Sequence, residues 1–246
     1  MQICKKLLIV PCYNEESCIG GTLQELSQVI DRDFKILVIN DGSEDATSEQ
    51  ASNTNMALVI DLPVNLGVGG AVQTGLKYAQ NKNMEIAVKF DGDGQHDPNS
   101  IAELIQPLKD DIADIVIGSR FMNSNQGYQS TFWRRIGIKF FEIICHLLTG
   151  KKITDPTSGL RAYNRKAIKF MSSHYPSFDY PEPEEIILAH KNNLRIKEVP
   201  AVMRDRQAGS STISSALSVY YMCKVTLAML FIAMRPPIRK EQTNNA

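Results

Sequence analysis

The sequence has no excess of charge of either sign and only five cysteines. Lysine and arginine number 27, and aspartate and glutamate also number 27, so the formal net charge is zero. A global electrostatic attraction to nucleic acid is not supported, and we expect no nucleic-acid partner. None of the five cysteines forms a C-x-x-C pair, which argues against a disulfide framework or a cysteine-based zinc site.

Several common ligand motifs are also missing. The sequence contains no Gly-Lys-Ser/Thr, so a P-loop is excluded. The glycines at 67, 69, 70 and 75 do not fit G-x-G-x-x-G, because Val72 occupies the sixth position; they indicate either a closely packed helix start or a ligand contact. An EF-hand loop beginning at Asp91 would need glycine and glutamate where His96 and Ala102 stand. We also expect no signal peptide, because the N-terminal residues contain no long apolar region.

The 246 residues, 43% hydrophobic and 22% charged, are typical of one large or two small globular domains. In the first half, apolar runs rich in β-branched residues alternate with segments of helical apolar spacing. Strands are predicted at 6–10, 35–40, 57–62, 85–90 and 114–118, and helices at 17–30, 46–53, 70–80 and 98–108. This alternation predicts a parallel sheet covered by helices on both faces. The second half predicts a helix at 131–148, a loop and strand-like turn at 155–163, a helix at 186–192 and a strand at 194–202.

The segment 216–234 is apolar except for Lys224, and Arg235, Arg239 and Lys240 follow it. A membrane span needs about 20 predominantly apolar residues, a length that this segment reaches only marginally. An interfacial helix, a short span, a partner-facing helix and a C-terminal core helix all stay open, and the basic flank favours membrane contact. We expect removal of residues 216–246 to shift the protein from the membrane pellet to the soluble fraction.

Polar clusters follow four of the predicted strands, at 11–16, 40–43, 91–98 and 118–120. In an open parallel sheet these ends meet at one edge, where ligands bind. The strongest cluster contains Asp91 and Asp93, two carboxylates separated by one glycine directly after an apolar strand. Such a pair suits Mg²⁺ or Mn²⁺ shared with a diphosphate, because these cations are often held by one or two carboxylates plus phosphates.

Several of these segments resemble family 2 glycosyltransferases. The motifs that carry the general likeness are VPCYNE at 10–15, NDGSED at 40–45 and NLG at 65–67. The motifs that narrow it to the dolichyl-phosphate mannosyltransferase-like branch, which transfers sugars to polyprenyl phosphates, are DGDGQHDP at 91–98, GSR at 118–120 and DPTSGLRA at 155–162. The resemblance covers about residues 7–212.

The resemblance implies an α/β fold of the GT-A type, with a Rossmann-like, mostly parallel sheet flanked by helices and a C-terminal apolar helical segment. We expect a glycosyltransferase domain over 1–212, a membrane-associating or partner-facing helix over 213–239 and a polar tail over 240–246.

The resemblance also implies roles for individual residues. The residues implied to cradle the base and ribose of the nucleotide-sugar donor are Pro11, Tyr13, Glu15 and Asp41. The residues implied to lie around the metal, Mg²⁺ or Mn²⁺, and around the diphosphate of the donor are Asp91, Asp93 and Gln95, and Gly92 is implied to contact the donor beside them.

Three arginines complete the implied site. Arg120, Arg134 and Arg206 are implied to face the phosphates of donor or acceptor, with Arg120 and Arg206 also binding the donor. Together with Asp93 they form the implied catalytic set. Arg206 begins a segment that resembles a mobile loop over the donor, and Thr212 in that loop replaces a lysine that relatives often carry. This departure leaves open a donor other than GDP-mannose.

The first hypothesis is therefore an inverting, metal-dependent transfer of a hexose or N-acetylhexosamine. The donor would be a UDP- or GDP-sugar, and the acceptor a polyprenyl phosphate (undecaprenyl or dolichyl) at the cytoplasmic face of a membrane. The phosphate acceptor is already anionic and needs positioning, for which arginine is suited, and no strong base. We expect the membrane surface as a partner, with a small membrane protein or a second copy of the chain as a further candidate.

Two other functions stay open. A transferase that extends a polysaccharide or lipid-linked oligosaccharide would need a general base, for which Asp155, Glu184 and Glu185 are candidates. A nucleotide-sugar-binding or membrane scaffold protein without turnover is the third candidate, and the intact Asp91, Asp93 and Arg206 argue against it.

Overall fold

A computed structural model describes residues 5–122, 132–204 and 215–238; for 132–134 and 215–219 it describes the backbone alone. The strands are β1 (Lys6–Cys12), β2 (Phe34–Asn40), β3 (Leu58–Asp61), β4 (Ile86–Lys89), β5 (Ile115–Ser119), β6 (Arg161–Asn164) and β7 (Ile196–Pro200). The helices are α1 (Ile19–Val29), α2 (Thr47–Asn53), α3 (Gly67–Asn81), α4 (Ser100–Lys109), α5 (Phe132–Thr149), α6 (Arg165–His174), α7 (Glu182–Lys191) and α8 (Ser215–Met234). The five strands and four helices predicted in the first half are confirmed.

The seven strands form one sheet in the order β3-β2-β1-β4-β6-β5-β7. Every neighbouring pair is parallel except the two that involve β6, which runs antiparallel to β4 and to β5. The carboxyl ends of the six parallel strands therefore meet at one edge of the sheet, as the alternating pattern predicts.

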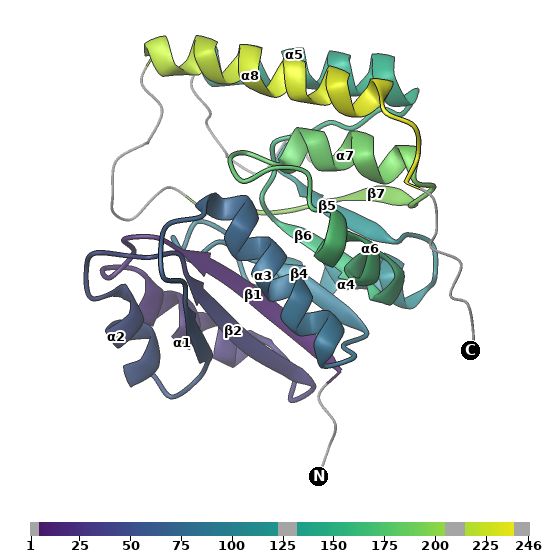
Figure 1. The fold of residues 1–246 in the computed structure, drawn as a ribbon. Coiled ribbons are helices and arrows are strands. Elements are labelled where there is room, and N and C mark those ends of the chain that lie inside the picture. Colours follow the sequence, from purple (N-terminus) through teal and green to yellow (C-terminus); the bar gives the residue numbers. More distant parts are fainter. Residues whose placement is uncertain (1–4, 123–131, 205–214, 239–246) are drawn as a thin grey trace, which may run out of the picture.

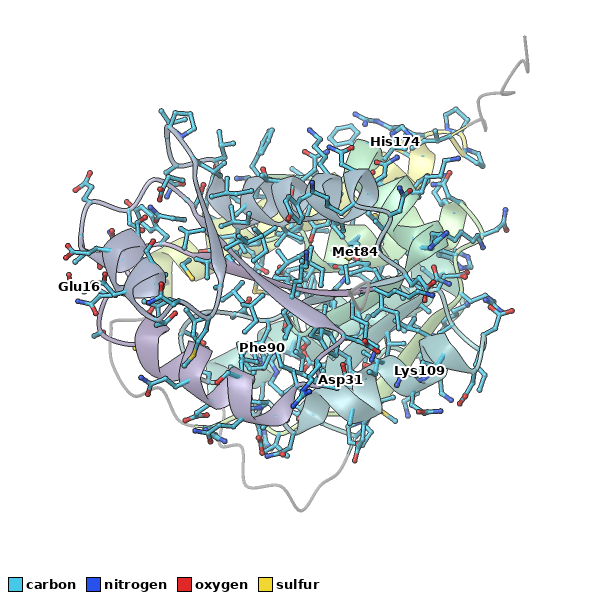
Figure 2. All side chains as sticks on the ribbon, turned by 90° about the horizontal axis from the view of Figure 1, so that it is seen from below. Glu16, Asp31, Met84, Phe90, Lys109 and His174 are labelled. Carbon is cyan, nitrogen blue, oxygen red and sulfur yellow. The ribbon has the colours of Figure 1, made fainter. Side chains whose placement is uncertain are left out.

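Helices cover both faces of this sheet (Figure 1). On one face, alternate residues of β1 such as Leu8 and Val10 pack with α1 and α4. On the other face, Leu7 and Ile9 pack with α3 and α6. Figure 2 shows the result: Phe90 lies inside the molecule, whereas charged side chains lie at its periphery. The alternation follows from the period of two along a strand.

The two elements around residue 161 differ from the prediction. The segment 155–163 is predicted as a loop and strand-like turn, yet β6 is an interior strand of the sheet, between β4 and β5. The strand has only four residues, and its first is the charged Arg161, so it lacks the apolar run typical of a buried strand. Helix α6 then begins at once, because the side chain of Asn164 accepts a hydrogen bond from the amide of Ala167 at 2.9 Å.

Helix α7 starts four residues before the predicted 186–192. Its apolar spacing does not indicate this start, because the first turn buries charged groups. Arg161 Nη1 pairs with Glu185 Oε2 at 3.1 Å, and both side chains are buried. Arg161 Nη2 also donates to the carbonyl of Glu182 at 2.8 Å, and Lys89 Nζ lies 2.6 Å from Glu182 Oε1. These glutamates take the place that apolar residues have in other core helices, so the helix has no apolar spacing at its start.

Helices α5 and α8 lie side by side as an outer layer beyond α7 (Figure 1). Val225 and Met229 of α8 are buried against Phe141 of α5 and Ile187 of α7. The apolar segment at 216–234 is thus helical, and one of its faces belongs to the core. Among the residues that the structure describes, no helix combines the length and the apolar character that a membrane crossing requires.

We expect Arg161→Met to lower the free energy of unfolding by about 3–5 kcal/mol, because the change leaves Glu185 buried without its partner. Urea-induced unfolding followed by far-UV circular dichroism measures the loss. Arg161→Met/Glu185→Leu removes both charges and should recover part of it. Lys139→Ala, which breaks the exposed 2.9 Å pair with Glu142, is the control and should cost about 0.5 kcal/mol or less. A loss below about 1 kcal/mol for Arg161→Met would contradict this role.

Candidate active site

The loops that follow β1 and β2 are tied together at the carboxyl edge of the sheet. The amide of Asn14 donates to Ser43 Oγ at 3.0 Å, and the amide of Glu44 donates to Asn14 Oδ1 at 2.9 Å. The amide of Glu15 donates to Thr47 Oγ1 at 2.8 Å. These hydrogen bonds hold the two loops against each other at this edge.

The four residues expected to hold the donor base and ribose all come from these two loops or the strand ends before them. Pro11 is buried within β1, and Tyr13 is 45% exposed two residues further on. Asp41 is buried, and its amide donates to the carbonyl of Cys12 at 2.8 Å. Asp41 Oδ1 accepts a hydrogen bond from the amide of Leu66 at 2.7 Å. Burial raises the pKa of Asp41, although amide hydrogen bonds oppose this.

The glycine run at the start of α3 is a packing feature. The amide of Gly69 donates to the carbonyl of Phe178 at 2.7 Å. A Cβ added at Gly69 would collide with the carbonyl of Ser177. The structure thus shows close packing of a helix start, and a ligand contact by these glycines stays a prediction.

Asp91 lies between positive and polar groups directly after β4. Its Oδ2 is 3.1 Å from His96 Nε2, and its Oδ1 is 3.9 Å from Lys89 Nζ. Burial raises the pKa of Asp91, but Lys89, His96 and Arg120 outweigh burial and hold the pKa well below its ordinary range. His96 is thus a partner of Asp91. The sequence does not predict the role of Lys89, since a lysine in a four-residue strand gives no signal that it is buried.

Asp93 and Gln95 form a tight turn next to Asp91. The amide of Gln95 donates to Asp93 Oδ1 at 3.1 Å, and the carbonyl of Gln95 accepts from the amide of Arg204 at 2.7 Å. Gly92, between the two aspartates, is buried against Cys12 Sγ and hydrogen-bonds through its carbonyl to Thr22 Oγ1 at 3.2 Å. The loop is therefore held from both sides while the two carboxylates stay partly exposed.

The described residues contain no group of three or more His, Cys, Asp and Glu side chains arranged to hold a metal on their own. The partly exposed Asp91 and Asp93 nevertheless fit a hard divalent cation that takes its remaining ligands from phosphates and water. The ionised state of Asp91 suits this, because carboxylate ligands must be deprotonated.

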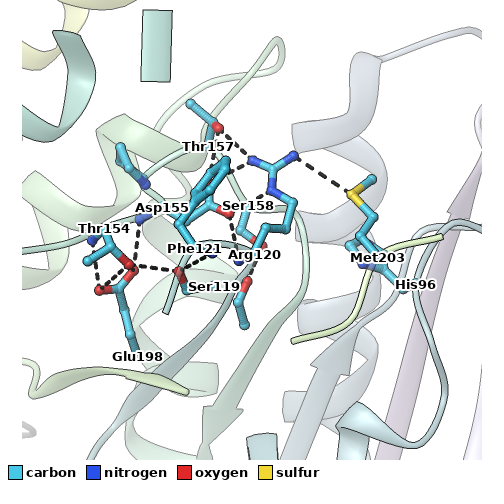
Figure 3. A network of polar contacts seen from close by, with 12 residues as sticks. His96, Ser119, Arg120, Phe121, Thr154, Asp155, Thr157, Ser158, Glu198 and Met203 are labelled. Carbon is cyan, nitrogen blue, oxygen red and sulfur yellow. Dashed lines mark hydrogen bonds and ion pairs between the residues drawn. The ribbon is translucent and has the colours of Figure 1, made fainter. Parts of the chain in front are cut away.

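Arg120, at the end of β5, is held by the carboxylate of Asp155 (Figure 3). Its Nε lies 2.6 Å from Asp155 Oδ2, and its Nη2 lies 2.7 Å from Asp155 Oδ1. Nη2 also donates to Thr157 Oγ1 at 2.9 Å, and Nη1 points to Met203 Sδ at 3.8 Å. This bidentate pair fixes the plane of the guanidinium group.

The three candidate bases are all buried. Asp155 is fully buried and bound to Arg120, and Glu185 is fully buried and bound to Arg161. Glu184 is 4% exposed, and Ser177 Oγ donates to its Oε1 at 3.2 Å. Burial raises the pKa of Glu184 to about 7.

Two expected arginines are not placed by the structure. Arg134 belongs to α5, but its side chain is outside the described atoms. Arg206, Thr212 and the loop between them lie outside the described residues. Their expected roles stay predictions.

Comparison with known proteins agrees with this geometry. The model of the family described as glycosyl transferase family 2 matches residues 7–171. An uncharacterised protein of Methanocaldococcus jannaschii is 38% identical over 195 residues, which are 78% of this chain and 79% of that protein. The UDP-N-acetylglucosamine–dolichyl-phosphate N-acetylglucosaminyltransferase of Methanococcus voltae is 37% identical over 210 residues, with 78% of this chain and 83% of that protein covered.

A solved structure shares the fold. Glucosyl-3-phosphoglycerate synthase from Mycobacterium tuberculosis, crystallised with Mn²⁺, UDP and phosphoglyceric acid, superposes with a TM-score of 0.71. The two chains are 19% identical, and the match covers 95% of this chain and 80% of that one. The sheet flanked by helices is thus a GT-A fold. With the family match over most of its length, the chain belongs to glycosyl transferase family 2 and is a glycosyltransferase.

Proposed function

We propose that this enzyme transfers a sugar from a UDP- or GDP-sugar to a polyprenyl phosphate, with inversion and with Mg²⁺ or Mn²⁺ as cofactor. The observation that carries the proposal is the meeting of Asp91, Asp93 and Arg120 at the carboxyl edge of the sheet. Two carboxylates suit a cation bound to a diphosphate, and a fixed guanidinium beside them suits developing phosphate charge. The 37% identity to a transferase named for UDP-N-acetylglucosamine and dolichyl phosphate supports the same substrate classes, with UDP-N-acetylglucosamine as the first donor to test.

We assign some of these residues to the donor and others to the phosphates of donor or acceptor. The loops after β1 and β2, with Tyr13, Glu15 and Asp41, bind the nucleoside. Asp91 and Asp93 hold the metal with Gln95 beside them, and a bound cation would neutralise the leaving diphosphate. Arg120, oriented by Asp155, stabilises phosphate charge, and Arg134 and Arg206 are proposed to do the same.

A phosphate acceptor also fits the burial of the candidate bases. A sugar hydroxyl must lose its proton during transfer, so its site needs a base that reaches the acceptor. Asp155 and Glu185 are each fully buried in an ion pair, which disfavours them as bases for a sugar hydroxyl. A lipid phosphate oxygen is already anionic and needs only to be aligned with the anomeric carbon.

We also propose that the outer layer of α5 and α8 rests on the membrane that holds the lipid acceptor, on its cytoplasmic side. Each helix exposes a stripe of large apolar side chains at helical spacing. The exposed residues are Ile136, Phe140, Ile143 and Leu147 on α5, and Tyr220, Leu227, Leu230, Phe231 and Met234 on α8. Exposed basic residues lie on or next to both helices, at Arg135, Lys139 and Arg235, and favour anionic lipid.

We expect Asp93→Ala to abolish transfer of radiolabelled sugar into the organic phase, because the change removes a metal ligand. The assay contains membranes, Mg²⁺ or Mn²⁺ and a panel of UDP- and GDP-sugars. Asp31→Ala is the matched control, because Asp31 lies before β2 at the opposite edge of the sheet and pairs with Lys6 (Figure 2). Organic-phase label that persists in Asp93→Ala, or is lost equally in Asp31→Ala, would contradict the assignment.

We expect Glu184→Gln to leave the rate of lipid-phosphate glycosylation within about twofold of the wild type, since that acceptor needs no base. If the enzyme instead extends a saccharide with Glu184 as base, the rate should fall by about 10²–10⁴. Initial rates at saturating donor, with polyprenyl phosphate and with an oligosaccharide acceptor in parallel, separate the two functions.

We expect Leu147→Asp/Phe231→Asp to weaken binding to phosphatidylcholine–phosphatidylglycerol vesicles by at least about tenfold. Each buried side chain of this size contributes about 1.5–3 kcal/mol to association with an apolar phase. Co-sedimentation with vesicles measures the effect. Leu58→Asp is the control, because Leu58 is equally apolar and 50% exposed but lies on β3, the far edge strand. Unchanged vesicle binding with an altered oligomeric state would assign this surface to a second copy of the chain.

A further inference from the structure

Glu198, on the edge strand β7, binds the start of the loop that carries Asp155 (Figure 3). Its Oε2 accepts a hydrogen bond from the amide of Thr154 at 2.7 Å, and its Oε1 accepts one from the amide of Asp155 at 2.9 Å. Thr154 Oγ1 contacts both carboxylate oxygens, at 3.1 and 3.2 Å, and lies 2.7 Å from Ser119 Oγ. One carboxylate thus fixes two successive backbone amides.

The loop fixed in this way sets the direction of Arg120. Asp155 is fully buried, and its two oxygens accept from Nε and Nη2 of Arg120 and also from the Arg120 amide at 3.1 Å. Thr157, two residues later, binds the same Nη2. A shift of the loop backbone therefore turns or releases the guanidinium group.

The other end of this loop lies against Asp91. A Cβ added at Gly159 would collide with the Asp91 carboxylate, so the loop backbone passes directly beside the proposed metal ligand. Between these ends, Ser158 Oγ donates to the carbonyl of Gly118 at 2.6 Å. The segment 154–159 therefore connects β7 to the guanidinium group of Arg120 and to the carboxylate of Asp91.

We propose that Glu198 is a positioning residue for the transfer reaction: by holding the amides of Thr154 and Asp155, it orients Arg120 toward the phosphates. The catalytic part of this proposal rests on the proposed function of Arg120. A carboxylate is required, because two amide donors need two acceptor oxygens. Glutamine offers one acceptor, and its amide group would face one of the donors.

Glu198→Gln tests the proposal with little change in shape. We expect kcat to fall by about 10–100-fold, because a displacement of about 1 Å in a site can cost about 10² in rate. The KM for the nucleotide sugar should change by less than about threefold, since Glu198 lies away from the loops that hold the nucleoside.

Asp114→Asn is the matched control for a merely structural effect. Asp114 is also a buried carboxylate of this sheet region that binds a backbone amide, that of Arg195 at 2.8 Å, but it precedes β5 at the opposite edge. Both variants should lower the melting temperature, and only Glu198→Gln should lower kcat. A kcat of Glu198→Gln within about twofold of Asp114→Asn would overturn the proposal.

A double-mutant cycle with Arg120→Ala tests whether Glu198 acts through Arg120. If it does, Glu198→Gln lowers kcat in the wild-type background and changes it by less than about twofold in the Arg120→Ala background. Losses that multiply in the double variant would show that the two residues act independently, which would also overturn the proposal.

An NMR readout separates this proposal from the proposed function. The Nε–H signal of Arg120, assigned by its absence in Arg120→Lys, should shift or broaden in Glu198→Gln and stay in place in Asp114→Asn. An unchanged signal in Glu198→Gln contradicts positioning, whatever the substrate is. If the signal changes but the wild-type protein glycosylates no lipid phosphate, the proposed function fails and the positioning of Arg120 stands.

Discussion

The buried guanidinium of Arg161 joins the centre of the sheet, helix α7 and the loop beside the site into one unit. It donates to the carbonyls of Ser158, Pro156 and Glu182 and pairs with the carboxylate of Glu185. A buried charge is tolerated only where its neighbours satisfy it, so the backbone that supplies these carbonyls has little freedom to move. The loop at 154–159 is thus fixed by the core, and the geometry of the site depends on a charge that is fully buried.

The parallel half of the fold could be predicted because its strands are apolar on both faces and alternate with helical patterns. The region around β6 could not be predicted, because the first residue of this strand, Arg161, is charged. Its burial depends on partners that lie elsewhere in the chain. Helix α6 begins directly after that strand, with Asn164 as its cap, so no polar loop separates the two elements. Helix α7 begins on buried glutamates, and an apolar periodicity cannot reveal a start that ion pairs stabilise.

The residues of the site also fall into those that the sequence predicts and those that it does not. The clusters after β1, β2, β4 and β5 were predictable because parallel topology alone brings them to one edge. The groups that support them were not, because their contacts cross the sequence: Lys89 meets Glu182 after 93 residues, and Glu198 meets Asp155 after 43. Each looks like an ordinary charged residue of a short strand. Only the folded chain shows that the buried ammonium group of Lys89 lies beside Asp91, and that the carboxylate of Glu198 fixes a loop.

Helix α8 shows why an apolar segment alone does not define a membrane element. A helix that is apolar on all sides is typical of a buried or a membrane-spanning position. Here one side, with Val225 and Met229, packs into the core, and the other side, with Leu227 and Phe231, is exposed. Removing 216–246 would therefore uncover core residues of α5 and α7 as well as the outer stripe. A truncated protein that changes fraction would not distinguish membrane contact from misfolding, whereas substitutions on the exposed side leave the core intact and test the exposed surface itself.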